Sequence, residues 1–273
     1  MMEYINEMFS YHFMTRAMIV GVLVSLCAAL LGVSLVLKRF SMIGDGLSHV
    51  GFGALAVASA LGLAPLSVSV PVVIAAAFLL LRISTSSRIK GDAAIALISS
   101  GALAVGVVVV SLTTGMNTDV SNYMFGSILS LSKADAILSV ILSVIVILLF
   151  VLLYPRIFAV TFDESFTRAT GVGAGRYNTV LAVLTAVTVV VGMRMMGALL
   201  ISSLIIFPAL SAMRVCRSFR SVVCCSAVIS VLCFICGMTA SYFLELPSGA
   251  SVVIANIIVF GAFSIAGFIK RKT

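Results

Sequence analysis

Residues 133–154, KADAILSVILSVIVILLFVLLY, form an almost unbroken apolar run after Asp135. A helix needs roughly 20 such residues to cross a hydrocarbon core roughly 30 Å thick. Similar runs give candidate spans at about 17–37, 46–63, 66–82, 92–112, 133–154, 177–192, 195–214, 221–244 and 249–269. We therefore expect an all-α integral membrane protein, a polytopic bundle of eight or nine transmembrane helices. The number is eight if the sixth and seventh runs form one broken helix.

The composition supports the same class of protein. Of the 273 residues, 62% are hydrophobic and only 10% are charged, and the mean hydropathy is +1.28. A soluble domain of this length needs more charge on its water-facing surface. A soluble globular protein is therefore excluded, and residues 1–273 are expected to form a single transmembrane domain.

The basic residues predict the orientation of the bundle. With the N-terminus outside the cell, 14 of the 17 Lys and Arg residues fall in loops on the cytoplasmic side. The other three are Arg16, Lys133 and Arg194. This asymmetry follows the positive-inside rule and predicts a cytoplasmic C-terminus. The net charge of +8 thus reflects topology and contact with anionic lipid, not nucleic-acid binding.

The second span begins in an unusual stretch, MIGDGLSHVGFG, at residues 42–53. Asp45 and His49 are four residues apart, so on a helix they lie on one face with Cβ atoms roughly 5–6 Å apart. Ionisable groups at membrane depth usually face a bundle interior or a wet cavity and mark a pathway. A carboxylate and an imidazole at this spacing can bind one divalent ion. The alternative is that Asp45 caps the helix and His49 is a hydrogen-bonded interior histidine.

Two further observations bear on energy supply. The chain contains no phosphate-binding G-x-x-x-x-G-K-[ST] motif, so any ATP must be bound by another chain. The longest cytoplasmic excursion, residues 154–176, is expected to hold a short amphipathic helix that ends at Gly171. A carrier that works without an ATPase is the rival interpretation, but it usually has more carboxylates within its spans.

Several motifs together resemble one known family, the membrane permeases of bacterial ABC importers for zinc, manganese and iron. The stretches that carry the resemblance are LLGVSLVLKRFSMIGDGLSHVGFGALAVASALG (30–62), GDAAIALISSGALAVGVVVVSL (91–112), DVSNYMFGSILSLSKAD (119–135), FDESFTRATGV (162–172), MGALLISSLIIFPALSAMRV (196–215) and LPSGASVVIAN (246–256). They follow one another in the family's order and cover nearly the whole chain.

The resemblance implies a transporter permease and not an enzyme, located in the bacterial cell membrane. It implies four kinds of neighbour: two copies of a cytoplasmic ABC ATPase that binds ATP, a second permease copy, an extracytoplasmic metal-binding protein and membrane lipid. No resident cofactor is implied. The transported ion is expected to be Zn²⁺, because IGDGLSHVGFG is closer to the zinc members than to the manganese members of the family. Mn²⁺ or Fe²⁺ is the alternative.

The resemblance also assigns roles to individual residues. Asp45 and His49 match the family's transient ion ligands, and weaker metal candidates are Ser100, Asp119 and Glu245. Ser100 stands where some zinc permeases have a histidine, which argues against zinc. The expected ATPase-coupling residues are Phe162, Asp163, Glu164, Arg168 and Gly171. Docking of the metal-binding protein is expected at Arg194 and Lys133.

Overall fold

The computed structural model describes residues 12–86, 91–113 and 132–272. Its elements are α2 (His12–Leu37), α3 (Ile43–Ala60), α4 (Pro65–Ser86), α5 (Gly91–Leu112), α7 (Lys133–Phe162), α8 (Glu164–Ala169), α9 (Ala174–Met196), α10 (Ala198–Val215), α11 (Phe219–Leu244) and α12 (Ser248–Lys272). Within these ranges every regular element is an α-helix, which confirms the expected all-α class.

Eight of the helices in the described ranges are long and apolar enough to cross a membrane. The remaining long helix is α3, which has 18 residues and contains Asp45 and His49. Helices α9 and α10 are not one broken helix, because they fold back on each other at Gly197. A Cβ atom built on Gly192 would lie 2.6 Å from Ile201 Cδ1, so the two helices are closely packed side by side.

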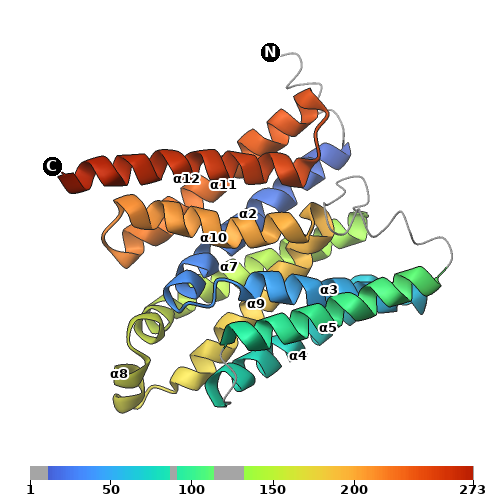
Figure 1. Ribbon diagram of the computed structural model, residues 1–273, viewed down its shortest axis with the longest axis horizontal. Coiled ribbons are helices and arrows are strands. Elements are labelled where there is room, and N and C mark those ends of the chain that lie inside the picture. Colours follow the sequence, from blue (N-terminus) through green and yellow to red (C-terminus); the bar gives the residue numbers. More distant parts are fainter. Residues whose placement is uncertain (1–11, 87–90, 114–131, 273) are drawn as a thin grey trace.

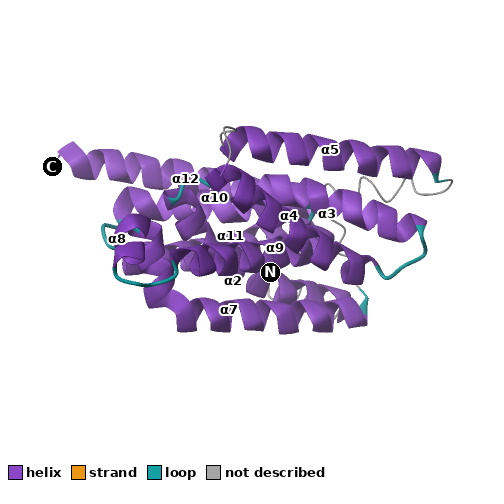
Figure 2. Cartoon of the chain, turned by 90° about the horizontal axis from the view of Figure 1, so that it is seen from below, coloured by secondary structure: helices purple, strands orange, loops and turns teal. Residues whose placement is uncertain are grey.

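Helix α2 is the centre of the bundle and packs against α7, α9, α10 and α11 (Figure 1). Helix α12 lies along α10 and α11. Helices α3, α4 and α5 pack on one another and join the rest through α9 and α10. The short helix α8 and the C-terminus lie toward the same end of the bundle in both views (Figures 1 and 2). This arrangement agrees with the expectation that both are on one side of the membrane.

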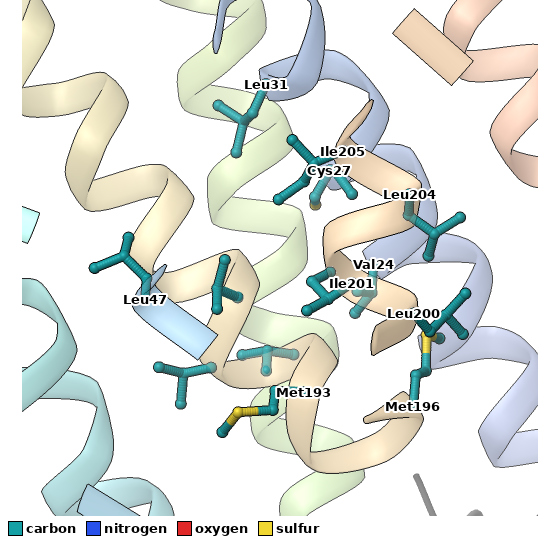
Figure 3. Packing of buried hydrophobic residues seen from close by; sticks show 14 of the residues in the cluster. Val24, Cys27, Leu31, Leu47, Met193, Met196, Leu200, Ile201, Leu204 and Ile205 are labelled. Atoms are coloured by element: carbon teal, nitrogen blue, oxygen red, sulfur yellow. The ribbon is translucent and has the colours of Figure 1, made fainter. Parts of the chain in front are cut away.

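The core between these helices is apolar and closely packed (Figure 3). Side chains from α2 meet side chains from α9 and α10, and Leu47 of α3 lies beside them. The labelled members are Val24, Cys27, Leu31, Leu47, Met193, Met196, Leu200, Ile201, Leu204 and Ile205. Dispersion contacts of this kind hold helices together in lipid, where no hydrophobic force acts between them.

The end of α7 differs from the sequence-based expectation, whereas the short helix after it is as expected. Helix α7 continues through Pro155 to Phe162, although its span was expected to end at residue 154. Proline is tolerated there because neighbouring groups satisfy the freed backbone acceptors in membrane helices. The expected short helix is present as α8, and Gly171 follows it with φ +81°. Glycine adopts this left-handed conformation without the penalty that a Cβ atom brings.

Candidate functional site

Asp45 and His49 lie on successive turns at the start of α3. Asp45 is in the first turn, and its Oδ2 atom is 3.7 Å from His49 Nε2. The N-cap residue is Met42, which makes no side-chain capping hydrogen bond. The alternative that Asp45 caps the helix is therefore wrong. Its carboxylate is nevertheless near the positive end of the helix dipole, which favours a negative charge.

The pair is accessible in the single chain. The side chain of Asp45 is 40% exposed and that of His49 is 22% exposed, so neither is sealed in dry packing. Their separation exceeds a hydrogen bond, and two ligands of tetrahedral zinc with bonds of about 2.1 Å are about 3.4 Å apart. A small side-chain adjustment would let the two atoms bind one ion.

A third polar group reaches this pair from another helix. The hydroxyl of Ser202 on α10 lies 3.3 Å from Asp45 Oδ1 and 3.2 Å from the carbonyl oxygen of Ala198, and its single hydrogen is shared between these two acceptors. Ser202 is not predictable as a site residue from the sequence, because nothing in the local pattern of α10 indicates a contact with α3. Among the described residues no third His, Cys, Asp or Glu completes a cluster with the pair.

Four glycines on α3 let neighbouring helices approach the pair. A Cβ atom built on any of them would lie within 3 Å of an atom from another helix. The contacts are Gly44 with Ile205 Cδ1 (2.7 Å), Gly46 with Ile95 Cγ2 (2.6 Å), Gly51 with Met193 Cε (2.8 Å) and Gly53 with the carbonyl oxygen of Ala102 (2.6 Å). Because these positions carry no side chain, α5, α9 and α10 can pack closely against the backbone of α3.

The weaker metal candidates are not joined to this pair. Ser100 is exposed on α5, and Glu245 is exposed at the end of α11 with φ +52°. In the described part of the chain, neither makes a hydrogen bond or ion pair with Asp45 or His49. Asp119 lies outside the described residues.

A second polar centre links the ends of α2, α7, α8 and α9. Its hub is Lys38, whose side chain is only 9% exposed. The Lys38 ammonium donates to the carbonyl of Val160 at 3.2 Å, to Glu164 Oε2 at 3.3 Å and to Asn178 Oδ1. From the sequence, Lys38 is only one of the loop charges, because its partners are more than 100 positions away.

Glu164 completes this network. Its Oε2 atom accepts from Asn178 Nδ2 at 3.0 Å, and its Oε1 atom accepts from Arg168. Burial opposes ionisation of Glu164, but the hydrogen bonds from Asn178 and Arg168 and the charge of Lys38 outweigh it, so the pKa of Glu164 is lowered. Burial also lowers the pKa of Lys38, and Glu164 partly counteracts this effect.

The remaining expected coupling residues lie on α8 or directly beside it. Asp163 caps this helix, because its Oδ1 atom accepts from the Phe166 amide at 2.8 Å. The rings of Phe162 and Phe166 are 60% and 66% exposed. The amide of Val172 donates to Thr167 O across the Gly171 turn. Helix α8 is thus a capped turn held by Lys38, with the exposed ring of Phe166 on it and the exposed ring of Phe162 at the adjoining end of α7.

The two expected docking residues differ in environment. Lys133 is exposed at the start of α7. Arg194 Nη2 is 2.9 Å from Asp135 Oδ2, and the two side chains are 18% and 16% exposed. The Arg194 charge is therefore paired within the chain, between the end of α9 and the start of α7.

Comparison with known proteins agrees with this architecture. The model of the ABC 3 transport family matches residues 10–267. The high-affinity zinc uptake system membrane protein ZnuB of Haemophilus influenzae is 29% identical over 244 residues, covering 89% of this chain and 94% of the relative. The manganese import system permease protein ScaB of Streptococcus gordonii is 25% identical over 274 residues, covering 99% and 98%.

The solved structures give the same result. PsaBC from Streptococcus pneumoniae, in complex with Fab, matches with a TM-score of 0.86 at 26% identity, covering 96% of this chain and 94% of that chain. The matches confirm a multi-pass membrane permease that is not an enzyme, since ATP hydrolysis in such transporters belongs to a separate ATPase subunit. A carrier that works without an ATPase does not fit them. The chain belongs to the ABC 3 transport family.

Proposed function

We propose that this chain is the permease of an ATP-driven importer that takes Zn²⁺ from an extracytoplasmic binding protein into the cytoplasm. Asp45 and His49 act as transient ligands of the ion. The observation that carries the proposal is the 3.7 Å separation of the carboxylate and the imidazole on partly exposed side chains. Family membership and relatives named for zinc and manganese support a metal ion as cargo.

The site chemistry suits an ion that binds and then leaves. A structural zinc site usually has four protein ligands, whereas Asp45 and His49 supply two. The carboxylate offsets part of the charge of a divalent cation in a medium of low dielectric constant. Ser202, hydrogen-bonded to Asp45, fixes the carboxylate and adds an oxygen close to the ion. Mn²⁺ remains the second candidate, because ScaB is a manganese import permease.

The α8 surface is the proposed contact for the ATPase, of which two copies would serve two permease copies. Phe162, Asp163, Glu164, Arg168 and Gly171 all belong to this surface or its anchoring. Because Lys38 ties α8 to α2, α7 and α9, movement of α8 would be transmitted to the central helix of the bundle. Lys133 at the opposite end is the proposed docking residue, with Arg194 behind it.

Zinc uptake into cells that depend on this importer tests the proposal. Asp45→Asn and His49→Gln keep the side-chain size and remove the charge or the imidazole, so each is expected to lower uptake at least about tenfold. Ser59→Ala, at the far end of α3, is the matched control and is expected to transport normally. Membrane levels of all variants are compared by immunoblot. Normal zinc uptake in both site variants would refute the ligand roles.

The choice of metal is tested in the same cells. With equal concentrations of Zn²⁺ and Mn²⁺ present, radioactive zinc uptake should persist and manganese uptake should be suppressed. The reverse result would assign the importer to manganese while leaving the roles of Asp45 and His49 intact.

A further inference from the structure

A hollow of about 490 Å³ lies between the end of α4 and the start of α9, beside α8. Its polar lining comes from Arg82, Arg168, Asn178 and Thr179, and its apolar lining comes mainly from α4, including Phe78 and Leu79. The volume is within the range of small-molecule binding sites. The metal-transit pair does not line it.

The hollow is located at one edge of the apolar layer. The candidate span of α4 is Pro65–Ile83, so Arg82 is next to its last residue. The span of α9 begins at Ala174, next to Gly175 in the lining. Arginine at the end of a membrane helix is at the level where hydrocarbon gives way to headgroups.

We infer that this hollow binds an anionic phospholipid, with the headgroup phosphate between Arg82 and Arg168 and an acyl chain along Phe78 and Leu79. Arginine pairs with phosphate through several charge-assisted hydrogen bonds. Phe78 and Leu79 are 45% and 51% exposed, so an apolar surface leads outward from the arginines. A soluble phosphate would leave that surface unused, which favours a lipid as the occupant.

Among the described residues, the carboxylate of Glu164 bonds to two side chains that line this hollow, and its charge is compensated. Glu164 accepts from Arg168 at Oε1 and from Asn178 at Oε2, and Lys38 Nζ lies 3.3 Å from the same Oε2 atom. The side chain of Arg168 is 63% exposed, so it can also contact an added anion. An occupant of the hollow would therefore touch the same side chains that anchor α8.

Lipid binding can be measured on the purified full-length chain, without metal or ATPase, by native mass spectrometry. The delipidated protein is titrated with dioleoyl phosphatidylglycerol and with dioleoyl phosphatidylcholine. We expect the anionic lipid to bind about tenfold more tightly, and Arg82→Gln/Arg168→Gln to remove this preference. Arg220→Gln, an exposed arginine at the start of α11, is the matched control and should keep it. If the double variant does not fold, Arg82→Gln alone is judged by the same criteria.

Two further measurements separate the competing occupants. Excess glycerol 3-phosphate should not displace the lipid, and Phe78→Ala should weaken binding of both lipids. Displacement by glycerol 3-phosphate would assign the hollow to a soluble phosphate and overturn the proposal. The double variant could also keep the lipid preference but fail to retain the ATPase in co-purification. That result would assign the two arginines to ATPase binding and would likewise overturn the lipid proposal. Because neither zinc uptake nor Asp45 enters these measurements, their outcome is independent of the proposed transport function.

Discussion

Lys38 Nζ lies 3.3 Å from Glu164 Oε2, although the two residues are 126 positions apart in the sequence. The contact joins the end of the central helix α2 to the short helix α8. Lys38 is almost fully buried and also donates to Asn178 on α9. The orientation of α8 is thus determined by a charged group outside the segment that was expected to contact the ATPase.

Replacing Lys38 by methionine should uncouple α8 from the bundle. The substitution keeps the length of the side chain but leaves Glu164 and Asn178 without their buried donor. We expect a loss of about 2 kcal/mol in stability, the usual contribution of a hydrogen-bonded charged group, and weaker stimulation of the ATPase. Thermal unfolding in detergent and ATPase activity of the reconstituted complex measure the two effects.

The neighbouring Arg39→Met variant is the control for Lys38→Met, because Arg39 is exposed. The double variant Lys38→Met/Glu164→Gln should lose less stability than the sum of the losses of the two single variants, since both changes remove the same contact. Additive losses of stability would show that the two residues act independently and do not share one network.

The lowered pKa of Glu164 predicts a dependence of stability on pH. Its pKa is below the ordinary value of 4.5 in the folded chain, so ionised Glu164 contributes stability above that pH. The contribution is lost as the pH falls below 4.5 and through the lowered pKa. The difference in unfolding temperature between the wild type and Glu164→Gln should be constant from pH 6 to 8 and should shrink in the acidic range. A difference that grows on acidification would mean that the sign of the shift is wrong.

The ion pair of Arg194 with Asp135 predicts a structural role for Arg194, whereas Lys133 is the proposed docking residue. Both side chains are mostly buried, and removing one partner leaves the other charge uncompensated. Arg194→Met should therefore destabilise the chain by about 3 kcal/mol. Lys133→Met removes an exposed charge and should leave stability unchanged while weakening capture of the metal-binding protein. Thermal unfolding and a pull-down with that protein distinguish the two variants. Equal stability of both would contradict the structural role of Arg194.

Local patterns in the sequence predicted the features that depend on local physics. Apolar runs of about 20 residues located the long helices, and the four-residue spacing of Asp45 and His49 placed them on one face. The contacts of Ser202 with Asp45, of Lys38 with Glu164, and of Arg194 with Asp135 could not be predicted in this way. Each joins residues from different helices, and their proximity depends on how the helices pack. The extension of α7 past Pro155 was missed because proline usually ends helices in water.

Gly53 tests whether close helix approach positions the metal-transit pair. A Cβ atom at Gly53 would lie 2.6 Å from the carbonyl oxygen of Ala102 on α5, and a backbone atom cannot move aside as a side chain can. Gly53→Ala should therefore cost about 1–3 kcal/mol in stability and reduce zinc uptake by displacing α3. Gly101→Ala on α5 is the matched control, because nothing lies within 4 Å of its added methyl group. That change should be neutral or slightly stabilising, since alanine favours helices over glycine. Thermal unfolding and uptake are measured on both variants, and equal behaviour would mean that the α3–α5 contact does not fix the position of Asp45 and His49.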